Sequence, residues 1–128
     1  MPLDEDVRAL LRAPNIAHLA TLLKDGSPHS IALWIGTQGE HITLFTWPNA
    51  LKARNMDRDA RVAISIHQHD RPLTSATIRG RVVDRLDGER GWAIVDRIAQ
   101  DYQGEPYPRD PEMVAYLIEP ERVKYQAY

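Results

Sequence analysis

The sequence contains no cysteine in its 128 residues. This absence excludes disulfide bonds, thiolate zinc sites and cysteine nucleophiles, and it is compatible with a reducing compartment. A hydrolytic pattern is missing as well, because neither a Ser/His/Asp order nor a pair of carboxylates at useful spacing stands out. The sequence alone therefore assigns no catalytic residue.

An excess of one charge sign is also missing. Sixteen Lys and Arg residues stand against eighteen Asp and Glu residues, for a net charge of −2. Nucleic-acid-binding domains usually carry a basic surface, so we expect no nucleic acid partner. The acidic N-terminal stretch 1–11 has no long apolar run, which predicts neither a secretory signal nor a membrane span. We expect a soluble cytoplasmic protein that does not bind membranes.

The chain is long enough for one hydrophobic core, and residues 1–128 are expected to form a single domain. Apolar alternation and turn residues predict mainly β structure with a few short helices. Asp87 is expected to cap the last helix, 67–74 to be a loop or bulge, and Glu119-Pro120 to be a turn. Sequential antiparallel strands in this number favour a closed or half-closed barrel. Strands are expected at 18–23, 30–35, 42–46, 61–66, 75–83, 113–118 and 122–125, and helices at 3–12, around Lys52 and after Asp87.

The segment 46–56 joins the end of a strand to the start of a short helix. Asn49 is a good N-cap residue, and the first amides of the helix have no backbone acceptor. Lys52 and Asn55 are neighbours on one helical face. Free N–H groups, the helix dipole and a cationic side chain all favour an anion, most simply a phosphate. The alternative is a basic helix that only faces water, and this segment by itself leaves both interpretations open.

Other polar and aromatic residues have ordinary interpretations. His67 and His69 alternate on one expected strand face, but no carboxylate or cysteine completes a ligand set, so we assign no metal site. His18 is expected to be a core or interface histidine. Tyr107, on the proline-rich loop 103–111, either covers a substrate pocket or anchors the loop.

Three blocks of sequence, at 16–29, 52–62 and 102–125, resemble the pyridoxamine 5′-phosphate oxidase-like superfamily in their order and spacing. The resemblance covers nearly the whole chain. Within the superfamily the sequence is most similar to the branch of flavin/deazaflavin oxidoreductases that uses the deazaflavin coenzyme F420. It implies a split β-barrel homodimer with two cofactor sites at the subunit interface.

By this similarity the cofactor phosphate lies at the start of the helix after the third strand, in the segment already selected on physical grounds. Lys52 would pair with the phosphate, Asn55 and the amides of 49–51 would bind near it, and Arg54 would hold the acidic tail of a deazaflavin. The ring would lie against the second and third strands, and an arginine of the fifth strand, from the other subunit, would complete the pocket. The implied cofactor-binding residues are Ala32, Leu33, Trp34, Thr46, Trp47, Pro48, Asn49, Lys52, Arg54, Asn55 and Arg79, with Arg81 as the alternative to Arg79.

The implied activity is that of a reductase in which reduced F420 transfers a hydride to an electron-poor small molecule, such as an enone, a quinone or a conjugated tetrapyrrole. Two departures argue against pyridoxamine phosphate oxidation itself. The stretch 30–34 lacks the arginine and lysine that bind the FMN phosphate in such oxidases, and no basic residue follows Lys124. An FMN-dependent oxidase or reductase on the same scaffold and a non-enzymatic cofactor-binding protein are the alternatives.

Overall fold

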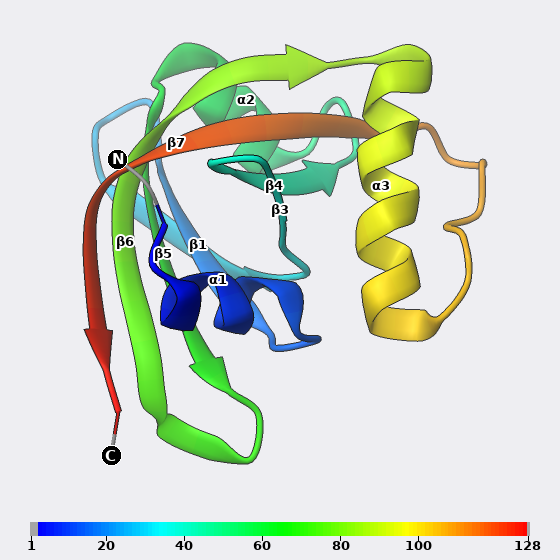
Figure 1. Ribbon diagram of the computed structural model, residues 1–128. Coiled ribbons are helices and arrows are strands. Elements are labelled where there is room, and N and C mark those ends of the chain that lie inside the picture. Colours follow the sequence, from blue (N-terminus) through cyan, green and yellow to red (C-terminus); the bar gives the residue numbers. More distant parts are fainter. Residues whose placement is uncertain (1–2, 128) are drawn as a thin grey trace.

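The computed structural model describes residues 3–127, in which seven antiparallel strands form one strongly curved sheet accompanied by three helices (Figure 1). The sheet has the order β2-β1-β5-β6-β7-β4-β3 and curls into a half-closed barrel, so the expected mainly β split β-barrel is confirmed. The elements are α1 (Glu5–Arg12), β1 (Ala17–Leu22), β2 (Pro28–Leu33), β3 (Gly36–Gln38), β4 (His41–Thr46), α2 (Leu51–Arg58), β5 (Arg61–Gln68), β6 (Arg71–Leu86), α3 (Gly88–Gln103) and β7 (Val114–Gln126).

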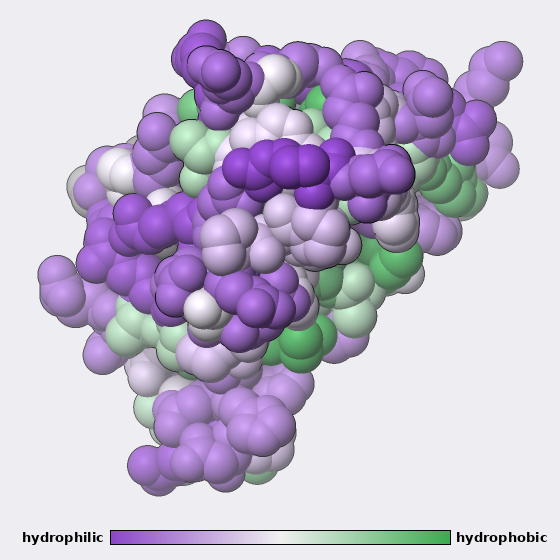
Figure 2. Space-filling model, turned by 90° about the vertical axis from the view of Figure 1, so that its right-hand side faces the viewer, coloured by the Kyte–Doolittle hydropathy of each residue, from purple (hydrophilic) through white to green (hydrophobic). Residues whose placement is uncertain are grey.

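The core lies inside the curled sheet because alternate strand residues point inward. In β5, Val62, Ile64 and Ile66 are buried while the residues between them are more exposed. The α1 helix packs its apolar face into the same core and buries Val7, Leu10 and Leu11, as predicted. Seen from the side of α3, the surface is largely hydrophilic, with hydrophobic residues exposed toward one edge (Figure 2).

Two short strands separated by a turn at Glu119-Pro120 were expected, but the structure has one strand, β7, across this stretch. It runs unbroken beside β6, and the register shifts between Arg79 and Gly80, opposite Pro120. A bulge accommodates proline, which lacks an N–H for the sheet ladder. A Cβ atom on Gly80 would lie 2.3 Å from the Glu119 carbonyl oxygen, so only glycine allows the two backbones to approach this closely.

Several other boundaries differ from the sequence-based expectations. The predicted loop 67–74 is mostly strand, because β5 extends to Gln68, β6 begins at Arg71 and only His69-Asp70 forms the turn. The expected bulge is present as a register shift between His67 and Gln68. The short strand β3 was not anticipated. Among residues 3–127, no helix combines the length and hydropathy needed to cross a membrane.

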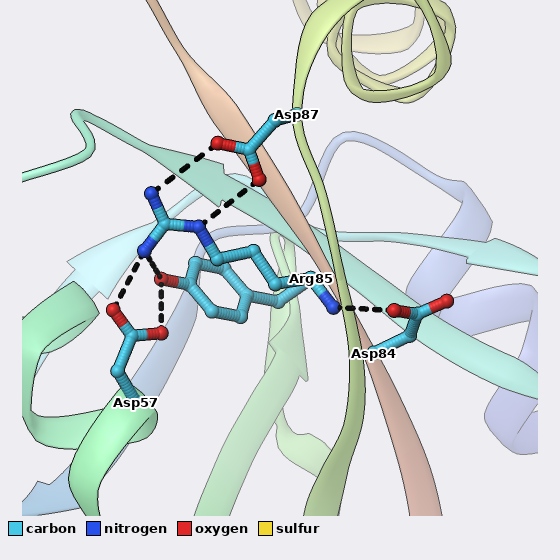
Figure 3. A network of polar contacts seen from close by, with 5 residues as sticks. Asp57, Asp84, Arg85 and Asp87 are labelled. Atoms are coloured by element: carbon cyan, nitrogen blue, oxygen red, sulfur yellow. Dashed lines mark hydrogen bonds and ion pairs between the residues drawn. The ribbon is translucent and has the colours of Figure 1, made fainter.

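A polar network fastens α2 to the sheet and to α3 (Figure 3). Arg85 of β6 donates from Nη1 to Asp57 of α2 at 2.6 Å, and from Nε to Asp87, the N-cap residue of α3, at 3.2 Å. The buried Tyr116 hydroxyl donates to the other Asp57 oxygen at 3.0 Å and accepts from Arg85 at 3.3 Å. Burial raises the pKa of Tyr116, so its hydroxyl stays protonated as the donor. This network fixes where α2 lies.

Replacing Tyr116 with Phe removes this hydroxyl and leaves the ring in place. We expect the free energy of unfolding to fall by about 1–3 kcal/mol, because Asp57 and Arg85 lose a buried hydrogen-bonding partner. Urea denaturation measures the change. Tyr125→Phe on the same strand is the matched control, because no described residue bonds that hydroxyl, and it should stay within about 0.5 kcal/mol of the wild type. Equal effects of the two substitutions would show that the network contributes no stability.

Candidate functional site

A pocket of about 230 Å³ opens where β2, the end of β4 and the start of α2 meet the loop between α3 and β7. Six predicted cofactor-binding residues line it, although they come from three separate segments. Phe45, Tyr107 and Met113 complete the lining. The six predicted residues are Ala32, Leu33, Trp34, Thr46, Trp47 and Lys52.

One wall of the pocket is a cluster of aromatic rings. The Trp34 ring stacks on Tyr102 with centroids 5.0 Å apart, and Phe45 meets Trp34 edge-on at 6.4 Å. The Tyr102 hydroxyl donates to the Asn15 carbonyl and accepts from the Ile35 N–H, which holds the ring behind Trp34 in place. Burial raises the pKa of Tyr102. The wall is therefore aromatic, and Trp34 is fixed from behind.

Lys52 is the cation of this pocket. Its side chain is about half buried, and this burial lowers the pKa of its ammonium group. No carboxylate within the described part of the chain pairs with it. Its Nζ lies 5.9 Å from the centre of the Trp47 ring, and Trp47 itself is 49% exposed. A partly desolvated ammonium without a counter-ion favours an anionic ligand.

The start of α2 corrects the predicted cap. Ala50, not Asn49, is the N-cap residue, because the Ala50 N–H first closes a turn onto the Trp47 carbonyl at 3.2 Å. The first helical bond runs from Arg54 to the Ala50 carbonyl at 3.0 Å. Alanine offers no side-chain acceptor, so among residues 3–127 none caps the N–H groups of residues 51–53. They remain available to an anion.

Thr46 has a buried hydroxyl at the wall of the pocket. Its side chain is 3% exposed, and its Oγ1 has no hydrogen-bond partner among the described residues. The other buried side-chain atom in this condition is His29 Nδ1. Buried hydroxyls in proteins normally find a partner, so Thr46 Oγ1 is a natural contact for a bound polar group.

Two of the predicted residues lie on α2 but do not line the pocket. Asn55 is buried against β1, where its amide nitrogen donates to Thr21 Oγ1 at 3.0 Å and its amide oxygen accepts from Arg58 at 3.0 Å. These contacts occupy the amide that we expected to bind near the phosphate. Arg54 is exposed and is not in the pocket lining.

The remaining predicted residues flank the pocket or lie elsewhere. Pro48 and Asn49 form the turn between β4 and α2 and are not part of the lining. Arg79 lines a separate groove of about 670 Å³ on the outer face of the sheet. Within one chain the structure therefore does not bring Arg79 and Lys52 together. The two regions meet on β2, where Ser30 lines the groove and Ala32 lines the pocket.

Phe45, Tyr107 and Met113 line the pocket but are not among the residues that the sequence predicted to bind a cofactor. Phe45 and Trp47 are two residues apart at the end of β4, and this spacing was a usable signal because such residues share a strand face. Tyr107 was noted only as a loop residue with two interpretations. Met113 carried no signal, because its place depends on how the loop after α3 returns to the sheet.

Comparisons with known proteins agree with this architecture. An F420 reductase of known structure is 28% identical to the chain, with a TM-score of 0.83, and the match covers 97% of this chain and 100% of that one. A protein of unknown function from Agrobacterium tumefaciens is 30% identical, with a TM-score of 0.73, over 91% of this chain and 53% of that one. A heme binding protein from Mycobacterium smegmatis is 26% identical, with a TM-score of 0.69, over 95% and 52%.

No curated protein matches the sequence. The family model described as pyridoxamine 5′-phosphate oxidase matches residues 3–127, nearly the whole chain. This match agrees with the curled antiparallel sheet and with the resemblance noted in the sequence. The chain belongs to the pyridoxamine 5′-phosphate oxidase family.

Proposed function

We propose that the protein is a cytoplasmic oxidoreductase that binds the deazaflavin coenzyme F420 in the pocket at the start of α2 and passes a hydride to an electron-poor small molecule. The observation that carries this proposal is the unpaired Lys52 ammonium beside three uncapped helix amides and an aromatic wall. The 28% identity to an F420 reductase, over 97% of this chain and 100% of that one, favours F420 over FMN.

The residues present fit a phosphorylated ring compound. Lys52 and the amides of 51–53 offer positive charge and N–H donors to a phosphate. Thr46 Oγ1 offers a hydrogen bond to a polar atom of the same ligand, which would satisfy its buried hydroxyl. Trp34 and Phe45 offer aromatic surface to a ring. Asn55 is left out of this assignment because its amide already bonds within the protein.

When bound, the deazaflavin supplies the hydride, and the protein contributes binding, orientation and exclusion of water. Lys52 would hold the phosphate end of the cofactor and so fix where its ring lies against the aromatic side chains of the pocket. This role of the cofactor agrees with the sequence, in which no pattern of nucleophilic or hydrolytic catalytic residues stands out.

Two alternatives use the same pocket. An FMN-dependent oxidase or reductase agrees with the family model, and it needs the same phosphate anchor. A non-enzymatic protein that stores a cofactor agrees with a related structure described as a heme binding protein. It predicts tight binding without turnover.

We also propose that two copies of the chain associate through the outer face of the sheet. The groove on this face has a floor of small side chains, which allows close approach, and its rim carries Arg79 for the second copy's pocket. Trp47 and Leu51 beside the pocket are 49% and 38% exposed. Association would cover such apolar surface.

Lys52→Ala should weaken binding of F420 and of FMN by roughly 1.5–3 kcal/mol, because a charge-assisted contact to phosphate is lost. Riboflavin has the flavin ring without the phosphate, so its affinity should stay unchanged. Quenching of tryptophan fluorescence measures all three affinities. Lys24→Ala, at the exposed β1–β2 turn, is the control. Unchanged F420 and FMN affinity in the Lys52 variant rejects the phosphate anchor.

Reduced F420 should be oxidised by the wild-type protein in the presence of a quinone, an enone or a conjugated tetrapyrrole, and absorbance of the cofactor follows the reaction. Reduced FMN should support slower turnover or none. The reverse preference would support the FMN alternative. Tight F420 binding with no turnover of any acceptor would support the storage protein.

The wild-type protein should sediment with twice the mass of one chain in analytical ultracentrifugation. Ser65→Arg should sediment as a monomer, because it places a long charged side chain on the exposed floor of the outer groove. Gln38→Arg, exposed on β3, should leave the dimer intact. A monomeric wild type rejects association, and a dimeric Ser65 variant rejects this face as the interface.

A further inference from the structure

The loop between α3 and β7 is held by a clamp of two charged side chains. Asp96 of α3 accepts two hydrogen bonds from the Arg109 guanidinium, at 2.9 and 2.5 Å. The same guanidinium lies over the Trp92 ring at 4.2 Å, which fixes its plane. Arg109 also holds the pKa of the Asp96 carboxyl below its ordinary value, so the pair stays charged at neutral pH.

The clamp closes around the backbone of Tyr107. The Tyr107 N–H donates to Asp96 Oδ1 at 3.2 Å, and its carbonyl accepts from Arg109 Nη1 at 3.1 Å. Both polar backbone groups of one loop residue are therefore bound by the same ion pair. Such a double contact restricts where the side chain of that residue points.

The Tyr107 ring reaches the pocket from this fixed backbone. It meets Phe45 edge-on at 5.1 Å and Trp34 nearly perpendicular at 6.2 Å, and it lines the pocket together with Lys52 and Thr46. No described residue bonds its hydroxyl. Together with Trp47, these three rings border a space of about 230 Å³.

We propose that Tyr107 is a specificity-determining residue that admits planar conjugated rings to this pocket, and that Asp96 and Arg109 are the residues that position it. The inference rests on the proposed function, because the planar ring belongs either to the cofactor or to the acceptor beside it. An aromatic ring that binds beside Trp34 and Phe45 gains an aromatic contact with Tyr107, which a branched aliphatic molecule of the same size does not.

Two measurements on the same variants show whether the cofactor ring or the acceptor ring contacts Tyr107. Tyr107→Ala should weaken riboflavin binding about tenfold if the cofactor ring contacts Tyr107. If instead the acceptor ring contacts Tyr107, the same substitution should raise the KM for menadione, a planar two-ring quinone, by a similar factor with little change in kcat. Tyr107→Phe retains the ring and should stay within about twofold of the wild type in both measurements. Either change in the alanine variant supports the inference, and no change in both overturns it.

A double-mutant cycle tests the clamp. Asp96→Asn should weaken binding of the same ligand that Tyr107→Ala affects. It should have no further effect in the Tyr107→Ala background, because Asp96 acts through the Tyr107 ring. A purely structural role of Asp96 would give additive effects and overturn its positioning role. Glu89→Gln, on the exposed face of α3, is the control and should change neither affinity nor KM. Thermal melting confirms that each variant is folded.

The outcome separates this inference from the proposed function. If Lys52→Ala weakens F420 binding and Tyr107→Ala changes nothing, only the role of Tyr107 is rejected. If the wild-type protein binds neither F420 nor riboflavin, both proposals are rejected together.

Discussion

The pairing of β6 with β7 is the constraint on which the rest of the fold depends. Both strands are long enough to belong to two parts of the sheet, because β6 also pairs with β5 and β7 also pairs with β4. They follow the curvature through register shifts, one of which lies between Arg79 and Gly80, opposite Pro120. Gly80 permits the close backbone approach at that point. Without this curvature β2 and β4, which lie near opposite edges of the strand order, would not line one pocket.

The functional pocket is a product of this curvature and of the network around Asp57. The curved sheet brings β2 and β4 to one side, and the Asp57–Arg85–Tyr116 contacts hold the C-terminal turn of α2 against the sheet. The N-terminal turn of α2 then leaves its amides without a side-chain cap and places Lys52 in the pocket lining. The helix is fastened at one end and leaves its donors free at the other, which is the arrangement that an anion site requires.

Local patterns predicted much of this arrangement. The buried face of α1, the strand alternation and the joint between β4 and α2 all follow from contacts within a few residues. Predictions failed where a local signal was overruled by a distant segment. Pro120 signals a turn, but Gly80 on the neighbouring strand accommodates it in a bulge. Asn49 is a good cap by type, yet the turn from Trp47 moves the helix start to Ala50. Asn55 and Lys52 were expected to share a helical face at the site, but the Asn55 amide nitrogen donates to Thr21 instead.

The sequence by itself determined the mainly β fold, the short helix after the third expected strand, and Lys52 as a cation near the start of that helix, because strand alternation and helix entry depend on neighbouring residues. Only the tertiary structure decided which aromatic rings meet at Lys52, that Thr46 has a buried unbonded hydroxyl, and that Asp96 and Arg109 hold Tyr107 at the pocket. These features join segments up to about eighty residues apart. Their geometry depends on how far the sheet bends, and no local pattern encodes that bend.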